Sequence, residues 1–238
     1  MNRIFGLALL AATMGSAVAA PPLLTALAGA GDNPAAPWHV VGMPGQTKPF
    51  TRFTIDSVDG RRVLRVEADA SYGHLVHPLP PATRARTLSW RWRLDEPNPR
   101  ADLRQKDGDD SPVKVCALFD LPIDAVPFVE RQLLRLSNLR SSEALPAASV
   151  CYVWDAHLAP GTQVENAFTR RIRFIVLRGP EAALHGWLSE RRDVEADFMR
   201  LFGDEATAPP PLVGVSVSAD ADNTSSHSVA HVADVDLR

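Results

Sequence analysis

Five basic side chains stand at alternating positions of segments with strand-like composition: Arg91, Arg93, Lys114, Arg171 and Arg173. Alternate residues of a strand lie on the same face of a sheet. If these segments are neighbours, the five side chains form a cationic strip on an outer face. Guanidinium groups offer planar donors that suit carboxylates and sulfates, so the strip predicts binding of an acidic glycan or envelope polymer. Cross-strand pairing with Asp95, Asp155, Glu190 and Asp193 remains the structural alternative.

The tryptophans next to these arginines are predicted to point into the core of the protein. Trp90 and Trp92 alternate with Ser89, Arg91 and Arg93, so the indoles point away from the guanidinium groups. They could form a stacking platform for sugar rings. Because the opposite face is clearly polar, we interpret the indole face as core, and we extend this interpretation to Tyr152 and Trp154.

Carboxylates offer a second kind of chemistry. Asp109 and Asp110 end an acidic loop, and Glu190 is a further candidate acid. Two carboxylates held at a set separation could hydrolyse a glycosidic bond. The loop also contains Gly108, and Asp and Gly residues commonly build turns, which is the alternative.

Oxygen ligands gather again near the end of the chain. Asp220, Asp222 and Asn223 lie within four positions, and Asp234 or Asp236 could approach from the last strand. Such oxygens could hold a structural calcium ion, although the spacing differs from the twelve-residue calcium loop. A hairpin connection is the alternative. The chain contains no zinc-ligand spacing, phosphate loop or nucleophile elbow, so we predict no other cofactor.

Short strands with two inserted helices must position these residues. Alternation, prolines and turn dipeptides delimit the segments. The predicted strands cover residues 50–57, 61–68, 72–79, 87–94, 113–119, 149–154, 170–177, 212–218 and 228–237. Amphipathic helices are predicted at 127–139, with Phe128, Leu133, Leu134, Leu136 and Leu139 at helical spacing, and at 193–202. This pattern predicts a mostly β, jelly-roll-like antiparallel β-sandwich.

The first residues predict export. Arg3 precedes an apolar stretch, and Ala17-Val18-Ala19 supplies a signal-peptidase pattern. We therefore predict a signal peptide at 1–19, a flexible lead-in at 20–37 and one domain at 38–238, in the periplasm or outside the cell. The predicted protein does not span a membrane, since the stretch is too short.

The charge composition limits the kinds of partner that this protein is expected to bind. Lys and Arg number 25 against 28 Asp and Glu. This mildly negative balance argues against non-specific nucleic-acid binding, which depends on neutralising phosphates. The oligomeric state is left open. The two cysteines, Cys116 and Cys151, either form a disulfide, as export permits, or are separate small buried residues.

Several short runs resemble a family of exported bacterial proteins known as domain of unknown function 3047. They are LSWRWRL at 88–94, ADLR at 101–104 with GDD at 108–110, CYVWD at 151–155, and DADNT at 220–224. The resemblance extends over 38–237 and implies no known activity or catalytic residue. The end of the chain also resembles jelly-roll carbohydrate-binding modules, which is a likeness of fold.

Three functions follow as hypotheses. The first is a non-catalytic protein that binds a glycan or other envelope polymer. The second is a polysaccharide hydrolase or lyase that uses Asp109, Asp110 or Glu190. The third is a structural envelope protein with a protein partner, which should expose a contiguous apolar patch.

Overall fold

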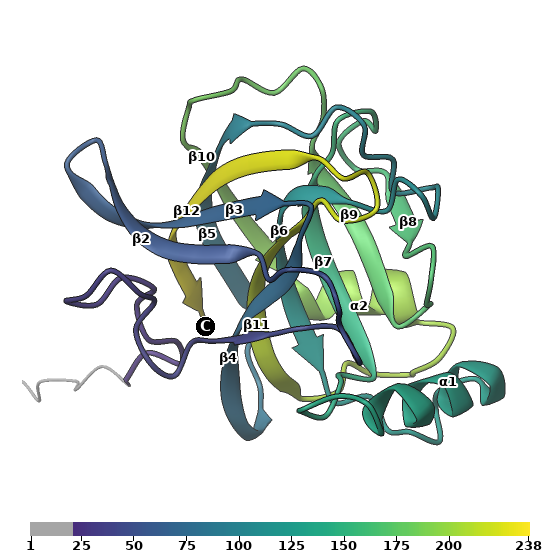
Figure 1. Cartoon of the computed structure of the whole chain (residues 1–238). Helices are drawn as coiled ribbons and strands as arrows, with labels where there is room; N and C mark the ends of the chain where they lie inside the picture. The colour runs from purple at the N-terminus through teal and green to yellow at the C-terminus, as the bar shows by residue number, and fades with distance from the viewer. Residues whose placement is uncertain (1–20) are drawn as a thin grey trace, which may run out of the picture.

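The computed structural model describes residues 21–238 as a sandwich of two β-sheets (Figure 1). The predicted signal peptide at 1–19 lies outside these residues. The elements are β1 His39–Val41, β2 Arg52–Val58, β3 Arg61–Asp69, β4 Tyr72–Thr83, β5 Thr87–Glu96, β6 Ser111–Phe119, α1 Phe128–Asn138, β7 Ala148–Trp154, β8 Gln163–Glu165, β9 Ile172–Arg178, β10 Leu188–Asp193, α2 Val194–Phe202, β11 Leu212–Asp220 and β12 His227–Leu237.

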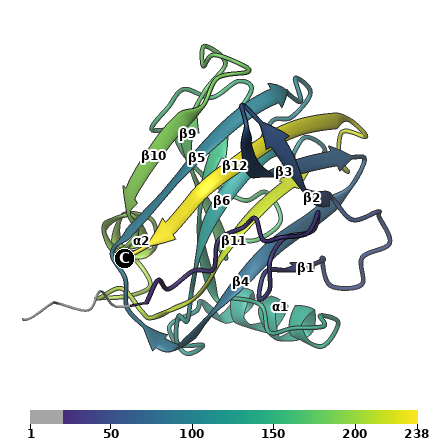
Figure 2. The same cartoon turned by 90° about the vertical axis from the view of Figure 1, so that its left-hand side faces the viewer.

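The strands divide into a seven-stranded sheet, β1-β4-β11-β6-β7-β9-β8, and a five-stranded sheet, β10-β5-β12-β3-β2. Figure 2 faces the five-stranded sheet, with the other sheet behind it. The chain passes repeatedly between the sheets, as in a jelly roll, and this confirms the predicted fold class. One pair departs from the antiparallel prediction: β7 and β9 are parallel. Their connection is long enough to return the chain to the same end of the sheet, which a parallel pair requires.

The core lies between the sheets. Trp90 and Trp92 of β5 face Tyr152 and Trp154 of β7, with ring centroids 5.2 Å and 5.9 Å apart in the two facing pairs. All four are nearly inaccessible to solvent. The prediction that these aromatic residues form core is confirmed.

The segment predicted to be a flexible lead-in packs onto the sandwich instead. Leu24 and Leu27 are buried in the core cluster. Trp38 stacks edge-on against His77 and donates from its indole to the carbonyl of Thr25. Ala, Pro and Gly between the leucines suggested a loop, whereas the leucines themselves have apolar partners on the core.

The two cysteines form a disulfide. Cys116 and Cys151 face each other across β6 and β7 in direct register, and the S–S distance is 2.08 Å. Their side chains lie on the outer face of the seven-stranded sheet, meaning the face turned away from the sandwich interior, in a small apolar cluster with Leu103, Val153 and Phe174. In the described range 21–238, no helix is long and apolar enough to cross a membrane.

Candidate functional site: a polar cluster on the seven-stranded sheet

The predicted cationic strip does not form. Arg91 and Arg93 lie on β5 in one sheet, whereas Lys114 on β6 and Arg171 and Arg173 before and on β9 belong to the other. The prediction required these strands to be neighbours in one sheet. Because the chain alternates between the sheets, the five side chains are divided among three surfaces.

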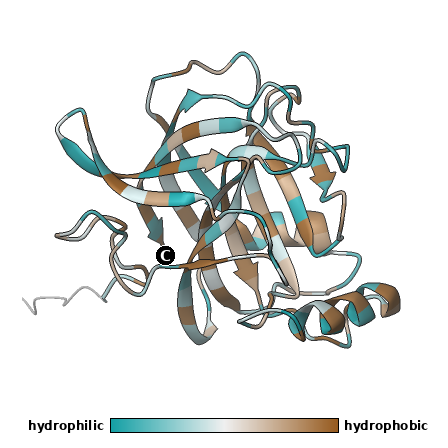
Figure 3. Ribbon diagram, in the orientation of Figure 1, coloured by the Kyte–Doolittle hydropathy of each residue, from teal (hydrophilic) through white to brown (hydrophobic). Residues whose placement is uncertain are grey.

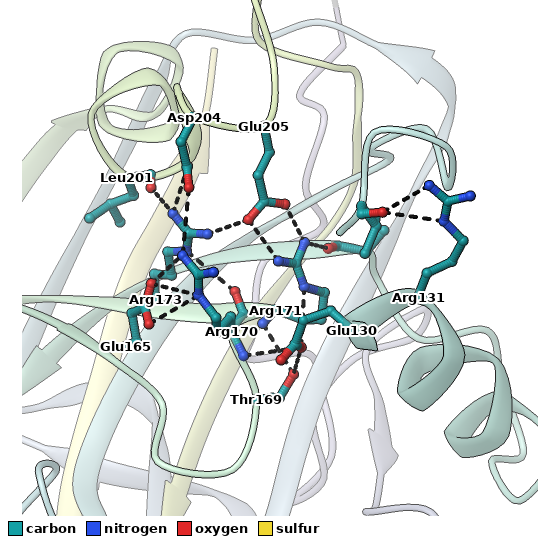
Figure 4. Close-up of polar contacts among 12 residues, drawn as sticks. Glu130, Arg131, Glu165, Thr169, Arg170, Arg171, Arg173, Leu201, Asp204 and Glu205 are labelled. Atoms are coloured by element: carbon teal, nitrogen blue, oxygen red, sulfur yellow. Dashed lines mark hydrogen bonds and ion pairs between the residues drawn. The ribbon is translucent and has the colours of Figure 1, made fainter. Parts of the chain in front are cut away.

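Arg171 and Arg173 are buried on the inner side of the seven-stranded sheet. Arg173 pairs in register with Val150, a core residue, and neighbours across a ladder share a face. Both guanidinium groups bind the carboxylate of Glu205, which follows α2 (Figure 4). Arg173 also lies 4.1 Å from the ring centroid of Phe202. The end of α2 therefore covers these arginines, which hold α2 to the sheet and do not meet a ligand.

Arg91 and Arg93 lie on the outer face of the five-stranded sheet, as predicted, but acidic neighbours neutralise them. Arg93 binds Asp95, a partner named in the structural alternative, at 2.7 Å, although the pair lies along β5 and not across two strands. Arg91 lies 3.5 Å from Asp234 and stacks on Trp187, 5.1 Å from its centroid. The positive charge needed to attract an acidic polymer is thus largely cancelled.

The candidate acid Glu190 lies apart from the loop carboxylates Asp109 and Asp110. Glu190 lies on β10 in the five-stranded sheet and accepts hydrogen bonds from the Trp92 indole at 3.0 Å and from Arg178 at 2.6 Å. Asp109 and Asp110 lie in the loop just before β6, which belongs to the other sheet. These carboxylates therefore do not face one another across a cleft.

The predicted calcium ligands are only partly assembled, because Asp234 lies in the other sheet from Asp220, Asp222 and Asn223. Asp220 binds the Lys114 ammonium at 2.5 Å, and the Asn223 amide donates to the carbonyl of Asp109. Asp234 belongs to the five-stranded sheet and binds Arg61 at 2.8 Å. Among residues 21–238, no three His, Cys, Asp or Glu side chains are grouped as metal ligands. The predicted set of four ligands therefore does not meet at one point.

The structure instead brings some of the predicted residues together with other polar residues on the outer face of the seven-stranded sheet. Ser218 of β11 pairs with His74 on one side and Lys114 on the other, and Asp220 pairs with Tyr72. Ser216 is two positions from Ser218 on the same face, and loops at the end of the strands add the remaining members. We define the polar cluster as Tyr72, His74, Asp109, Lys114, Ser216, Ser218, Asp220 and Asp222.

A latch between two loops fixes the carboxylates of this cluster. Asp110 accepts hydrogen bonds from the backbone amides of Asn223 and Thr224 and from the Thr224 hydroxyl. Asp110 thereby joins the loop before β6 to the loop after β11. Its neighbours Asp109 and Asp222 are positioned over the sheet as a result. This structural role differs from the acid or base role predicted for Asp110.

Burial sets the protonation states inside the polar cluster. It raises the pKa of Asp109 to about 7, against the opposing attraction of Lys114. Burial also raises the pKa of Asp222, with a further contribution from Asp110. It lowers the pKa of His74 to about 3, so this imidazole is neutral. The Tyr72 hydroxyl, whose pKa burial raises, therefore donates to Nε2 of His74 at 2.6 Å.

Four buried atoms of the polar cluster lack a hydrogen-bond partner within the protein. They are Asp109 Oδ1, Ser216 Oγ, Ser218 Oγ and Asp222 Oδ1. Leaving a buried polar atom unpaired costs about 1–3 kcal/mol, so native proteins satisfy such atoms with water or a ligand. Their concentration in one cluster makes it the candidate place for ordered water or a ligand.

An aromatic rim borders the polar cluster. Phe50 pairs with Tyr72 in an isolated bridge, and its side chain is 54% exposed. A Cβ added to Gly42 would lie 2.7 Å from the Phe50 ring, so the backbone runs directly against this ring. Lys48 lies in the same loop as Phe50, and its positive charge favours the ionised form of Asp222. The rim thus combines an exposed aromatic surface with a cation.

Sequence reasoning named Asp109, Lys114, Asp220 and Asp222 as candidates for three different sites, and did not select the other four residues of the polar cluster. Alternation does place Ser216, Ser218 and Asp220 opposite the apolar Val215, Val217 and Ala219. The sequence therefore contained the signal for these three residues. It did not show that β11 pairs with β4, which is far away in sequence, and this pairing brings Tyr72 and His74 alongside the serines.

Comparisons with known proteins identify the family. The family model described as "Protein of unknown function (DUF3047)" matches residues 36–236. The chain belongs to this family. No curated protein matches it.

Among solved structures, the chain is similar to the xyloglucanase domain of NopAA, a type three effector from Sinorhizobium fredii, solved with cellobiose. The TM-score is 0.41 at 9% identity, over 85% of this chain and 98% of that one. It is also similar to the endoglucanase cel12A from Rhodothermus marinus, with a TM-score of 0.40 at 12% identity, over 84% and 95% of the two chains. Both likenesses are too distant to bear on activity.

Proposed function

We propose that this protein binds a neutral, hydroxyl-rich glycan at the polar cluster. The observation that carries the proposal is the set of four buried oxygen atoms without partners, at Asp109, Ser216, Ser218 and Asp222. Carboxylates accept from sugar hydroxyls, and serine hydroxyls can donate or accept. A sugar supplies both donors and acceptors on one small surface, which matches this mixture.

The charge of the polar cluster supports a neutral ligand over an acidic one. Lys114 is already bound to Asp220, so its charge is not available. The remaining acidic side chains, Asp109 and Asp222, lie beside Asp110 and are either neutral or negatively charged. A uronate or sulfate placed here would meet like charge. The acidic envelope polymer expected from the arginines is therefore the less suitable ligand.

The aromatic rim supplies the apolar contact that sugar rings favour. Phe50 is exposed beside Tyr72, and the half-buried Tyr72 ring continues toward the unpaired oxygens. A pyranose stacked on Phe50 would direct its hydroxyl groups toward Asp222. The predicted signal peptide supports an encounter with this glycan in the periplasm or outside the cell.

Affinity measurements on soluble neutral polysaccharides test this proposal. Phe50→Ala and Asp222→Asn should each raise the dissociation constant about tenfold or more, which corresponds to about 1.4 kcal/mol. Phe128→Ala is the matched control, because Phe128 is an exposed phenylalanine on a helix remote from the polar cluster. Arg91→Ala tests whether the arginines of the predicted cationic strip contribute to binding. Equal binding by wild type and both cluster variants would disprove the site, and preferential binding of uronic-acid polymers would disprove the choice of ligand.

One observation favours a second candidate, glycoside hydrolysis. A carboxyl group with a pKa of about 7 can donate a proton near neutral pH, as a general acid must, and Asp109 meets this condition. Asp222 is the carboxylate that could assist it. Release of reducing ends from a bound glycan, lost in Asp109→Asn while binding persists, would establish this activity. Binding without release would leave the protein a binding protein.

A further inference from the structure

Helix α1 turns its apolar face outward. The prediction of an amphipathic helix here is confirmed, but Leu134 is the buried residue of the helix. Phe128, Val129, Leu133 and Leu136 are 71%, 67%, 48% and 50% exposed, and Leu139 at the C-cap is 82% exposed. The helix lies at the periphery of the molecule (Figure 1), and Figure 3 shows its hydrophobic residues in brown.

Polar contacts on the opposite side hold α1 in this orientation. Glu130 accepts hydrogen bonds from the Thr169 hydroxyl and the backbone amide of Arg170. Arg131 donates to the carbonyls of Asp124 and Val126. The inward side of the helix is therefore the side that carries bound charges. The outward apolar face is fixed in place and cannot turn inward without breaking these contacts.

The free charges beside the apolar face are positive. Arg135 and Arg140 are exposed, and within residues 21–238 no carboxylate lies within ion-pair distance of either. Glu130, the acidic residue in the first turn, is turned toward Thr169 and is mostly buried. An approaching surface thus meets apolar side chains bordered by guanidinium groups.

The size of this face argues against a stable pair of identical chains. Eleven helical residues extend about 16 Å. A stable protein interface usually needs roughly 20–30 residues on each side, whereas this face offers five apolar side chains and two arginines. A lipid surface has no such minimum, because apolar side chains partition into it individually and anionic headgroups attract nearby arginines.

We infer that α1 docks the protein onto an anionic lipid surface. The apolar face of Phe128, Val129, Leu133, Leu136 and Leu139 enters the boundary between headgroups and acyl chains. Arg135 and Arg140 contact phosphate groups at its border. This inference is independent of glycan binding, because the polar cluster lies on strands β4, β6 and β11 and the loops beside them and shares no residue with α1.

Vesicle flotation with the purified protein tests this inference. The vesicles consist of phosphatidylcholine alone or phosphatidylcholine mixed with phosphatidylglycerol. The wild type should float with the mixed vesicles and bind much less to phosphatidylcholine alone. Leu133→Ser combined with Leu136→Ser should reduce the bound fraction at least tenfold on mixed vesicles. Arg135→Gln combined with Arg140→Gln should remove the preference for anionic lipid, as should high salt.

Two controls keep the result interpretable. Leu184→Ser changes an apolar residue of similar exposure, 41%, on a distant loop and should leave flotation unchanged. Leu139→Glu replaces a side chain at the helix end that is 82% exposed, so it tests docking without disturbing packing. Absence of wild-type flotation with mixed vesicles would overturn the inference. So would equal losses in Leu184→Ser, or wild-type dimers in solution that Leu139→Glu dissociates.

Discussion

A buried carboxyl group whose pKa lies near neutrality links this site to pH. The pKa of Asp109 is raised from 3.8 to about 7 by burial. The folded state therefore holds this proton more tightly than the unfolded chain does. Its contribution to stability is complete below about pH 4 and is lost as the pH rises to about 7. The loss is on the order of 4 kcal/mol for a shift of about three pH units.

Asp109→Asn removes this titration while retaining an oxygen that accepts from Asn166. Urea unfolding at several pH values should show the wild type losing stability relative to the variant between about pH 4 and 7. The difference isolates Asp109 from other groups, such as Glu67 and Asp95, whose pKa values are lowered. Parallel stability curves for the two proteins across this range would show that Asp109 is not perturbed.

At the residue scale, the sequence predicted which face of a sheet a side chain occupies better than it predicted which residues that side chain contacts. Alternation placed the indoles of Trp90 and Trp92 in the core and Arg91 and Arg93 outside, and both are confirmed. It could not reveal that Arg171 and Arg173 share the core-side face with Tyr152, because that depends on the register of a parallel pair. Their partner Glu205 lies in the segment after α2, which no periodic pattern connects to β9.

At the scale of elements, the disulfide ties two central strands together. Cys116 and Cys151 are 35 positions apart, and a loop of this length corresponds to about 4 kcal/mol in the chain-entropy model. Replacing both residues by Ala should lower the free energy of unfolding by about 3–4 kcal/mol. Lys114 of the polar cluster lies on β6. Glycan binding by the double Ala variant should therefore be lost only at temperatures where β6 and β7 separate.

Chemical denaturation with and without a reductant measures this effect. The wild type with reductant should approach the stability of the double Ala variant, and the variant itself should not respond to the reductant. Equal stability of wild type and variant under oxidising conditions would contradict the prediction. The sequence left this pairing open, since two cysteines in separate strands may be bonded or merely buried, and only the direct register of β6 and β7 decides it.

Nine strands and both helices were located from the sequence because strand alternation and helical spacing are local properties, whereas the short strands β1, β8 and β10 were not predicted. The orientation of α1 did not follow from the sequence. Its apolar spacing was recognised, yet an amphipathic helix normally turns that spacing inward. Here Glu130 and Arg131 anchor the polar side to Thr169 and Val126, and these are contacts to distant or irregular segments.

At the scale of the whole molecule, topology decides which residues can meet. Consecutive strands β5 and β6 lie in different sheets, so the basic residues they carry are divided. Strand β11, near the end of the chain, lies between β4 and β6 and completes the polar cluster. Long-range order of this kind has no signature in a local pattern. It is why the sandwich could be predicted from the sequence and the site could not.

The segment before β1 also belongs to this long-range order, and its contribution can be measured. Leu24 and Leu27 are 5% and 6% exposed, and the amide of Thr25 donates to Nε2 of His77 on β4. Leu24→Ala and Leu27→Ala should each lower the free energy of unfolding by about 2 kcal/mol, because each removes buried apolar contacts. Ala26→Ser, at an exposed position between them, should have little effect. Limited proteolysis of the native protein should spare residues 24–38 in the wild type and cut there in the leucine variants. Rapid wild-type cleavage in this segment, with unchanged stability of the variants, would restore the flexible lead-in that composition alone suggests.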